Sequence, residues 1–321
     1  MLAQITSYLG RMRSLLPSLR AEGYYVPYLY WDFLMCFFKY GCVLDQYVRG
    51  GFYKMSSYER RRSMTYKRIL YVYDKCITPD YIHFLQNKID FNRYFSSIIR
   101  RKWLYGKDMS ENDFDALCHS APALIVKPLN ESEGRGIRKI IVPETVDGAK
   151  IVFASLTGQE VIIEECLVSH KDMVFGSSSL NTLRVHSLLD CDGNVHFMKF
   201  ILRVGVGDSV VDNYCAGGCI YEIDEETGCV ISKGYSKVHP ESIVHPGTEI
   251  IMLGRQIPFW QEVKELVCKA HKMIPQMRFI GWDVAITGDG PELIEGNHHP
   301  DYDLLEFVGT RLWWPKFKKY L

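Results

Sequence analysis

The chain has 321 residues, 47% of them apolar and 24% charged, which are average values for a globular protein. This length predicts about two domains, and the composition excludes disordered, collagen-like and coiled-coil proteins. The net charge is zero, with 38 basic and 38 acidic residues, which by itself argues against a partner that is a nucleic acid or a membrane surface. The charges are unevenly distributed, however. Residues 1–110 hold 18 Lys and Arg against 8 Asp and Glu, and the other 211 residues hold 20 against 30.

The ten cysteines indicate a reducing compartment. They lie between Cys36 and Cys268 without a CxxC pair or the spacing of a zinc site, so they do not form the framework of a disulfide-rich domain. The N-terminal segment contains Arg11 and Arg13 where a secretory signal needs an uninterrupted apolar core. We therefore expect a cytoplasmic protein that retains this segment.

The longest apolar stretch covers residues 24–44. It contains Pro27, Asp32 and Lys39, and it is too mixed for a membrane span of about 20 apolar residues. Its many aromatic residues and the flanking arginines would suit a segment that lies at a membrane interface. We favour the alternative, an ordinary buried helix, because apolar helical patterns usually belong to a protein core.

The chain divides into a helical part and a part rich in strands. Residues 1–118 show helical periodicity, with strong helix formers at 58–73 and 78–104. After Pro122, short β-branched runs separated by turn residues predict a largely antiparallel sheet, and an amphipathic helix follows Pro258. The fold class is therefore α+β. The predicted strands cover residues 123–127, 138–142, 161–165, 182–189 and 196–204.

A hairpin that carries acidic residues is predicted near the C-terminus. Two strand-like runs flank the sequence Gly-Asp-Gly-Pro at 288–291, which favours a turn. If the turn centres near Asp289, Asp283 and Glu295 lie directly opposite each other, and Asn297 points to the same face. Two opposed carboxylates call for a cation or solvent between them, and Mg²⁺ suits carboxylate and amide oxygens. An exposed hairpin with solvated acids is the alternative. The side chains expected on the apolar face are Trp282, Val284, Ile286 and Ile294.

A lysine and a glycine-bearing loop follow the first predicted strand. Lys127 ends this strand, and residues 130–137 form the loop. An ammonium group and several backbone N–H groups in such a loop can surround phosphate oxygens. The loop is neither a Walker A motif nor a Rossmann fingerprint, and an ordinary hairpin turn is the alternative.

Basic residues alternate with apolar ones along two later strands. Arg184 and His186 share one face of their strand, and Lys199 and Arg203 share one face of the next strand. The planar guanidinium group binds phosphate or carboxylate well. Salt bridges to nearby acids explain the arginines equally well.

Taken together, these motifs resemble the ATP-grasp superfamily, and most closely the sugar-transfer-associated ATP-grasp proteins found with polysaccharide biosynthesis. The resemblance covers most of the chain and rests on the order and spacing of short motifs. These are Tyr47-Val48-Arg49, Tyr58-Glu59-Arg60-Arg61-Arg62, Asn87-Lys88-Ile89-Asp90-Phe91-Asn92, Ile125-Val126-Lys127-Pro128, Gly134-Arg135-Gly136-Ile137, Val161-Ile162-Ile163-Glu164-Glu165, Asn181-Thr182-Leu183-Arg184, Val211-Asp212-Asn213 with Gly217-Gly218, and Gly281-Trp282-Asp283 with Glu295-Gly296-Asn297.

The resemblance implies an ATP-grasp fold, in which two α+β subdomains with antiparallel sheets grip ATP, preceded by a helical N-terminal region. We expect the helical region at 1–118 and the ATP-grasp domain at 119–321. Within that domain, a lid-bearing small subdomain is expected at 119–168, and a subdomain for metal and acceptor binding at 169–321.

The resemblance also implies roles for individual residues. Lys88 and Lys127 match the two lysines that hold the α- and β-phosphates of ATP, although Asn87 stands where the family usually has aspartate. Arg184 and Arg203 match catalytic positions at the γ-phosphate or an acyl-phosphate. The other matches are Glu133, Gly134 and Gly136 in the lid, Glu164, Glu165 and Leu167 in the hinge that meets adenine and ribose, Asp283, Glu295 and Asn297 as Mg²⁺ ligands, and Asn181, Asp212 and Asn213 at the acceptor.

The implied activity is that of an ATP- and Mg²⁺-dependent, ADP-forming carboxylate–amine ligase in the synthesis of capsule, another cell-surface polysaccharide or a sugar conjugate. A second hypothesis is an ATP-grasp kinase that phosphorylates a hydroxyl group of a sugar or lipid-linked sugar. A third is a non-catalytic adaptor for a membrane or a glycosyltransferase. The expected partner is a small-molecule or glycan acceptor, and no nucleic acid is expected. The basic N-terminal region, including residues 60–62 and 100–102, is expected to meet an anionic acceptor or polysaccharide assembly machinery at the inner face of the membrane.

Overall fold

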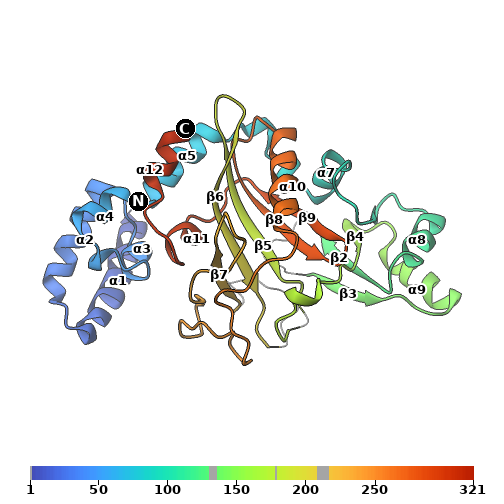
Figure 1. Cartoon of the computed structure of the whole chain (residues 1–321), viewed down its shortest axis with the longest axis horizontal. Coiled ribbons are helices and arrows are strands. Elements are labelled where there is room, and N and C mark those ends of the chain that lie inside the picture. Colours follow the sequence, from blue (N-terminus) through green and yellow to red (C-terminus); the bar gives the residue numbers. More distant parts are fainter. Residues whose placement is uncertain (1, 130–135, 178, 208–216) are drawn as a thin grey trace. The chain divides into compact units, whose positions relative to one another are not determined.

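The computed structural model describes residues 2–129, 136–177, 179–207 and 217–321 (Figure 1). The chain forms two compact units. The first consists of Met1–Cys76 together with Asp301–Leu321, and the second is the continuous segment Ile77–Pro300. These units are defined by contacts within the fold, whereas the predicted boundary at residue 118 came from the change from a helical to a strand-like sequence pattern. The predicted limits of the ATP-grasp domain and its subdomains stay a prediction.

The first unit is helical. Its core contains the inner faces of several helices, including Leu16, Phe33 and Tyr47, all of which are fully buried or nearly so. None of the helices in the described part of the chain has the length and apolarity needed to cross a membrane. The helices are α1 (Leu2–Ser18), α2 (Val26–Tyr40), α3 (Leu44–Val48), α4 (Ser57–Arg62), α5 (Tyr66–Cys76), α11 (Asp303–Glu306) and α12 (Trp314–Tyr320), with 3-10 turns η1 (Leu19–Glu22) and η2 (Phe52–Lys54).

Two buried carboxylates tie the first unit together. Asp32 in α2 receives two hydrogen bonds from Arg60, at 2.6 and 2.8 Å, and one from the Tyr47 hydroxyl at 2.7 Å. Glu306 accepts hydrogen bonds from the backbone N–H groups of Met64 and Leu312. Because Glu306 follows residue 300 in the chain, this contact fastens the C-terminal segment to the N-terminal helices.

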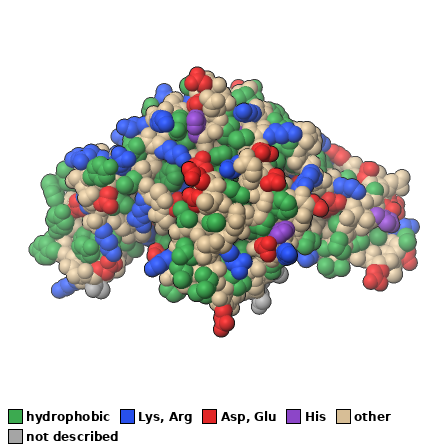
Figure 2. All heavy atoms as spheres, in the orientation of Figure 1, with side chains coloured by type: hydrophobic (Ala, Val, Ile, Leu, Met, Phe, Trp, Pro, Cys, Tyr) green, Lys and Arg blue, Asp and Glu red, His purple; other side chains and the backbone are tan. Residues whose placement is uncertain are grey.

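The first unit is also strongly basic. It holds 16 Lys and Arg against 8 Asp and Glu, and the second unit holds 22 against 30. At the left of Figure 2, Lys and Arg side chains lie beside hydrophobic side chains on the surface of the first unit. The charge asymmetry seen in the sequence therefore follows the structural units.

The second unit contains two antiparallel sheets. The strand order is β1-β4-β2-β3 in one sheet and β7-β6-β5-β8-β9 in the other, and every pairing is antiparallel. The strands are β1 (Trp103–Tyr105), β2 (Ala123–Pro128), β3 (Arg138–Ile141), β4 (Val161–Glu165), β5 (Thr182–Leu189), β6 (Val195–Val204), β7 (Cys219–Ile223), β8 (Phe279–Thr287) and β9 (Gly290–Asn297). The helices are α6 (His83–Gln86), α7 (Lys88–Tyr94), α8 (Glu111–Cys118), α9 (Val146–Leu156) and α10 (Trp260–Met273), with 3-10 turns η3 (Pro79–Tyr81) and η4 (Lys171–Met173).

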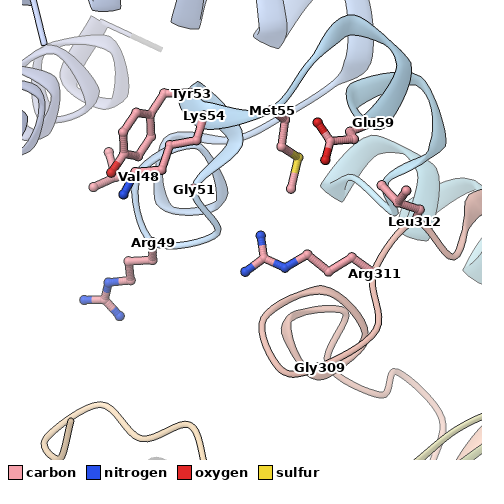
Figure 3. Close-up of a pocket in the computed structure, with 10 residues that line it drawn as sticks. All are labelled: Val48, Arg49, Gly51, Tyr53, Lys54, Met55, Glu59, Gly309, Arg311 and Leu312. Atoms are coloured by element: carbon pink, nitrogen blue, oxygen red, sulfur yellow. The ribbon is translucent and has the colours of Figure 1, made fainter. Parts of the chain in front are cut away.

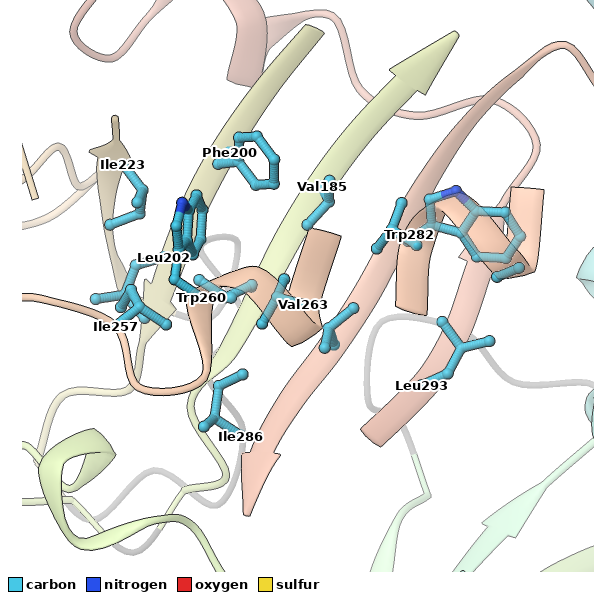
Figure 4. Close-up of a cluster of buried hydrophobic side chains, with 14 of the residues drawn as sticks. Val185, Phe200, Leu202, Ile223, Ile257, Trp260, Val263, Trp282, Ile286 and Leu293 are labelled. Atoms are coloured by element: carbon cyan, nitrogen blue, oxygen red, sulfur yellow. The ribbon is translucent and has the colours of Figure 1, made fainter. Parts of the chain in front are cut away.

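Helix α10 covers one face of the five-stranded sheet (Figure 4). Its apolar side chains Trp260 and Val263 pack with strand residues such as Val185 and Leu202, which alternate toward this face. Trp282 is fully buried in the same core and meets the ring of Phe95 edge-on at a centroid distance of 5.6 Å. The opposite face of the sheet is left for polar side chains.

The predicted α+β class, the antiparallel sheets and the amphipathic helix after Pro258 are confirmed. One expected helical stretch, residues 78–104, is wrong at its end. Helix α7 stops at Tyr94, and residues 103–105 form strand β1, which pairs with β4. Long-range pairing with β4 outweighs the local preference in this segment.

Candidate functional site

The polar face of the five-stranded sheet carries the predicted arginines and carboxylates. Arg184 in β5 lies directly opposite Asp283 in β8, and Asp283 lies directly opposite Glu295 in β9. Arg203 in β6 lies opposite Thr182, two residues from Arg184. Directly opposed residues share a face of a sheet, so four neighbouring strands bring these four charged groups together.

A bulge in β9 creates the pairing of the two carboxylates. From the turn inward, the register places Val284 opposite Leu293. Continued unchanged, it would place Asp283 opposite Ile294 and turn Glu295 to the other face. The register instead shifts between Asp283 and Val284, so that Asp283 pairs with Glu295, as the sequence predicted.

The bulge also changes which side chain reaches the apolar face. Leu293 is fully buried in the core beside α10, whereas Ile294 is only partly buried. The expectation that Ile294 joins Trp282, Val284 and Ile286 on this face is therefore wrong. It assumed unbroken alternation through the position where β9 has an extra residue.

Both oxygens of Asp283 are engaged by arginine. Arg184 Nε lies 2.5 Å from Oδ1 and its second nitrogen 3.2 Å from Oδ2, while Arg203 approaches Oδ2 at 2.9 Å. Burial alone would raise the pKa of Asp283, but the positive charges of Arg184 and Arg203 outweigh it and hold the pKa well below its usual range. Asp283 is therefore ionised at neutral pH.

Glu295 has the opposite tendency. Burial raises its pKa, and the negative charge of Asp283 raises it further. A cation between the two groups would favour the charged form of both. The oxygens of Asp283, Glu295 and Asn297 form the donor set that a hard divalent ion prefers, so these residues fit Mg²⁺. Within the described residues, no group of three or more His, Cys, Asp or Glu side chains could hold a metal ion. The proposed Mg²⁺ ligands differ from such a group because they are two carboxylates, Asp283 and Glu295, and one amide, Asn297.

Glu164 in β4 is the centre of a second charged cluster. Its Oε2 lies 2.5 Å from Lys127 Nζ, and its Oε1 accepts hydrogen bonds from Arg101 at 2.8 Å and Asn92 at 3.0 Å. Burial would raise the pKa of Glu164, but Arg101 and Lys127 hold it well below its usual range. The ionised carboxylate fixes the ammonium group of Lys127 at the end of β2.

Arg101 links this cluster to the five-stranded sheet. Its side chain is only 2% exposed, and besides Glu164 it donates to Glu292 at 3.2 Å and to the carbonyl oxygens of Leu293 and Ile294 in β9. Sequence reasoning missed this role and placed Arg101 in the basic run 100–102, which was expected to meet an anionic acceptor. Its partners lie 63 and 191 residues away along the chain, so no local pattern indicates them.

Lys88 and Lys127 meet at the same end of β2. Lys88 Nζ donates to the carbonyl oxygen of Pro128, the residue after Lys127, at 3.2 Å. Lys88 is the first residue of α7, and Asn87 caps this helix by accepting hydrogen bonds from two backbone N–H groups at 2.9 and 3.2 Å. The local role of Asn87 is thus that of a helix cap.

The remaining predicted nucleotide residues lie close by in the chain. Gly136 has φ +69°, and a side chain there would place its Cβ 2.9 Å from the ring of Pro128. Glu165 accepts a hydrogen bond from the backbone N–H of Lys102 at 2.9 Å, and Leu167 is partly buried in the loop after β4. Two predicted lid residues, Glu133 and Gly134, lie outside the described residues.

Asn181, predicted at the acceptor, is fully buried. Its amide nitrogen donates to the carbonyl oxygen of Met173 at 2.7 Å, and its Oδ1 accepts from the backbone N–H of Gly205 at 3.0 Å. These contacts join the segments before β5 and after β6. The other predicted acceptor residues, Asp212 and Asn213, lie outside the described residues.

Two further ionisable groups are buried on the polar face. His186 and Lys199 lie directly opposite each other, and Lys199 Nζ is 3.7 Å from Glu222 Oε2. Burial lowers the pKa of His186 well below its usual range, and the charges of Arg184 and Lys199 lower it further. The imidazole is therefore neutral at physiological pH.

A pocket of about 480 Å³ lies in the first unit, apart from these clusters (Figure 3). Among its basic residues, Arg49 lies 3.2 Å from Asp45, and Lys54 lies 2.8 Å from Glu22. None of the described residues that line it was predicted as a site residue. They are Val48, Arg49, Gly51, Tyr53, Lys54, Met55, Glu59, Gly309, Arg311 and Leu312.

Two antiparallel sheets, one with a lysine–glutamate pair and the other with paired carboxylates beside arginines, define an ATP-grasp fold. The chain belongs to the sugar-transfer associated ATP-grasp family, whose model matches residues 54–316. No significant match exists among curated proteins.

Several solved structures are similar to this chain. The ATP-grasp ligase PsnB, complexed with a phosphomimetic variant of its minimal precursor, Mg and ADP, has 14% identity and a TM-score of 0.45, covering 75% of this chain and 58% of that chain. The D-alanyl-alanine synthetase A from Vibrio cholerae O1 biovar eltor has 13% identity and a TM-score of 0.41, covering 74% and 60%. The N5-carboxyaminoimidazole synthetase from Staphylococcus aureus, complexed with ADP, has 12% identity and a TM-score of 0.39, covering 68% and 45%. The chain thus spans at most three-fifths of the length of these proteins.

Proposed function

We propose that the protein is an ATP- and Mg²⁺-dependent ligase that joins a carboxylate to an amine and forms ADP. The observation that carries this proposal is the opposed pair Asp283 and Glu295 with Arg184 and Arg203 beside it. A nucleotide phosphate with a divalent ion needs such anionic and cationic groups on one surface. Membership of the ATP-grasp family supports the same chemistry.

The ion pairs of Asp283 indicate how this site would accept a nucleotide. Arg184 and Arg203 can bind phosphate oxygens as well as they bind a carboxylate. Asp283, Glu295 and Asn297 would hold Mg²⁺, which neutralises the charge on the phosphates when bound. The two arginines would then move from Asp283 to the γ-phosphate.

Residues of the four-stranded sheet would hold the rest of the nucleotide. Lys127 and Lys88 are proposed to bind the α- and β-phosphates. Glu164 supports this role because its carboxylate pairs with Lys127 and restricts the position of the ammonium group. Arg101 connects Glu164 to Glu292, so the two sheets share one buried network of charges.

The proposed reaction has two steps. A carboxylate oxygen of the acceptor attacks the γ-phosphorus, the bond to the β-phosphate oxygen breaks, and ADP and an acyl-phosphate form. The amine then attacks the carbonyl carbon, phosphate leaves, and the amine loses a proton to solvent. Arg184 and Arg203 would stabilise the negative charge that develops on oxygen in both steps.

We further propose that the product is a cell-surface polysaccharide, such as a capsule, or a sugar conjugate. The description of the family as sugar-transfer associated supports this assignment. The carboxylate or the amine would then belong to a sugar or to a group attached to one.

The test is turnover of ATP with Mg²⁺ and a panel of carboxylated sugars, amino sugars and amino acids. A ligase releases phosphate only when a carboxylate and an amine are both present. A stable phosphorylated acceptor without free phosphate would instead identify a kinase. Asp283→Asn should abolish turnover, whereas Asp289→Asn, in the exposed turn of the same hairpin, should retain it. If ATP with Mg²⁺ leaves the melting temperature unchanged, the protein has no working nucleotide site.

A further inference from the structure

Helix α2 has two apolar faces, and only one of them is buried. Leu29 and Phe33, each 1% exposed, lie on the inner face and pack in the core of the first unit. On the opposite side of the helix, Trp31 is 64% exposed and Phe38 is 77% exposed. The outer face of α2 consists of Tyr28, Trp31, Leu34, Met35 and Phe38.

The outer face is a continuous stripe. Its members are three, four or seven positions apart, which places them on one side of a helix. Tyr25, at the start of the helix, is 74% exposed and extends the set of exposed aromatic residues. Single exposed apolar side chains are common, but a contiguous group of this size usually marks a contact surface.

Negative charge is kept away from this stripe. Asp32 is the only acidic residue of α2, and it is turned inward, where Arg60 and the Tyr47 hydroxyl bind its carboxylate. Lys39, next to Phe38, is exposed. The exposed side of the helix is therefore apolar with a positive charge at its C-terminal end.

The charge of the first unit favours an anionic partner. With 16 Lys and Arg against 8 Asp and Glu, the unit repels a second copy of itself, so that pairing of two copies through α2 is disfavoured. Anionic lipids attract basic segments, and Trp and Tyr concentrate at the interface between lipid and water. A helix with an exposed aromatic stripe can lie in that interface with the stripe among the acyl chains.

We propose that the outer face of α2 binds the protein to the surface of an anionic lipid bilayer. The stripe supplies the apolar contact, and the basic residues of the first unit supply the electrostatic attraction. The proposal requires no nucleotide and no turnover. Membrane binding can therefore be tested separately from the ligase function.

The experiment is sedimentation of the full chain with vesicles. Wild-type protein should bind vesicles of phosphatidylcholine mixed with phosphatidylglycerol, bind pure phosphatidylcholine vesicles much more weakly, and dissociate as salt is added. The double variant Trp31→Ser/Phe38→Ser should bind the mixed vesicles roughly tenfold or more weakly, because it loses the two most exposed rings of the stripe. The matched control Val146→Ser/Ile151→Ser removes two apolar side chains from α9 that are 72% and 71% exposed, and it should bind like wild type.

A spectroscopic readout locates the contact. Addition of mixed vesicles should shift the tryptophan emission of wild-type protein to shorter wavelength, and Trp31→Phe should remove most of this shift while binding persists. Equal binding of wild type and the double variant would overturn the proposal. The proposal would also be overturned if wild-type protein bound pure phosphatidylcholine vesicles as strongly as mixed vesicles. It would be overturned as well if wild-type protein bound no vesicles and instead formed a dimer that the double variant abolishes.

Discussion

Asp283 and Glu295 lie directly opposite each other across β8 and β9 because β9 contains one residue more than an unbroken hairpin would need. The two carboxyl groups have opposite tendencies. Asp283 is held ionised by two arginines, whereas the pKa of Glu295 is raised by burial and by Asp283. This difference has a consequence for stability as a function of pH.

Glu295→Gln should stabilise the protein at neutral pH. Because the pKa of Glu295 is raised in the folded state, its contribution to stability is present below the unfolded value of about 4.3 and is lost as the pH rises through the folded value. Glutamine does not ionise, so the variant does not lose stability in this way as the pH rises. Its melting temperature should therefore exceed that of wild type by a margin that grows as the pH rises above about 4.

Glu226→Gln, in an exposed turn, serves as the control and should follow wild type at every pH. A lower melting temperature for Glu295→Gln across the whole range would show that the ionised form of Glu295 is favourable in the folded protein. Addition of Mg²⁺ with ATP should raise the melting temperature of wild type and leave that of Glu295→Gln nearly unchanged.

Arg101→Met should destabilise the second unit strongly. The change leaves Glu292 and Glu164 buried with one cationic partner fewer, and breaking a buried ion pair in this way costs about 3–5 kcal/mol. The neighbouring Lys102→Met, at an exposed position, should change stability by about 0.5 kcal/mol or less. Thermal unfolding of both variants is the measurement, and equal effects would mean that the buried network contributes little.

Arg60→Ala should destabilise the first unit by about 3 kcal/mol, because it leaves the carboxylate of Asp32 buried without its guanidinium partner. Arg61 is exposed, and Arg61→Ala should be nearly neutral for stability. The comparison separates two roles for this basic run. If Arg60→Ala keeps wild-type stability and lowers only acceptor use, Arg60 contacts the acceptor as the sequence suggested.

Gly136→Ala should weaken both folding and nucleotide binding. Its positive φ costs an alanine about 1–2 kcal/mol, and the Cβ would press on the ring of Pro128 next to Lys127. Gly158→Ala is a matched control, since Gly158 has φ +75° but open space around the position. We expect a similar cost from φ in both variants, and a weaker affinity for ATP, measured by calorimetry, only for Gly136→Ala.

Much of the second unit could be predicted from the sequence. The predicted strands 161–165 and 182–189 agree with β4 and β5 residue for residue, because β-branched runs bounded by turn residues are local signals. The shared face of Arg184 and His186 follows from the same alternation. Local periodicity was enough for these features.

The failures concern relationships that no local pattern contains. The bulge that exchanges Ile294 for Leu293 is one extra residue without a distinctive sequence. The sequence also contains no sign that acids from distant segments form ion pairs with the arginines at 60, 100 and 101. For α2, the sequence offered a choice between a buried helix and an interfacial one, and the structure shows one buried and one exposed apolar face.

The backbone passes between the two units twice, at residues 76–77 and at residues 300–301. The second unit is thus an insertion in the first, whose core includes Phe307 and Phe317 and whose Glu306 binds the backbone of Met64. During synthesis, the helices before residue 77 leave the ribosome ahead of the second unit but lack these partners until residues 301–321 have been made. The first unit should therefore complete its folding only after the whole second unit has been made.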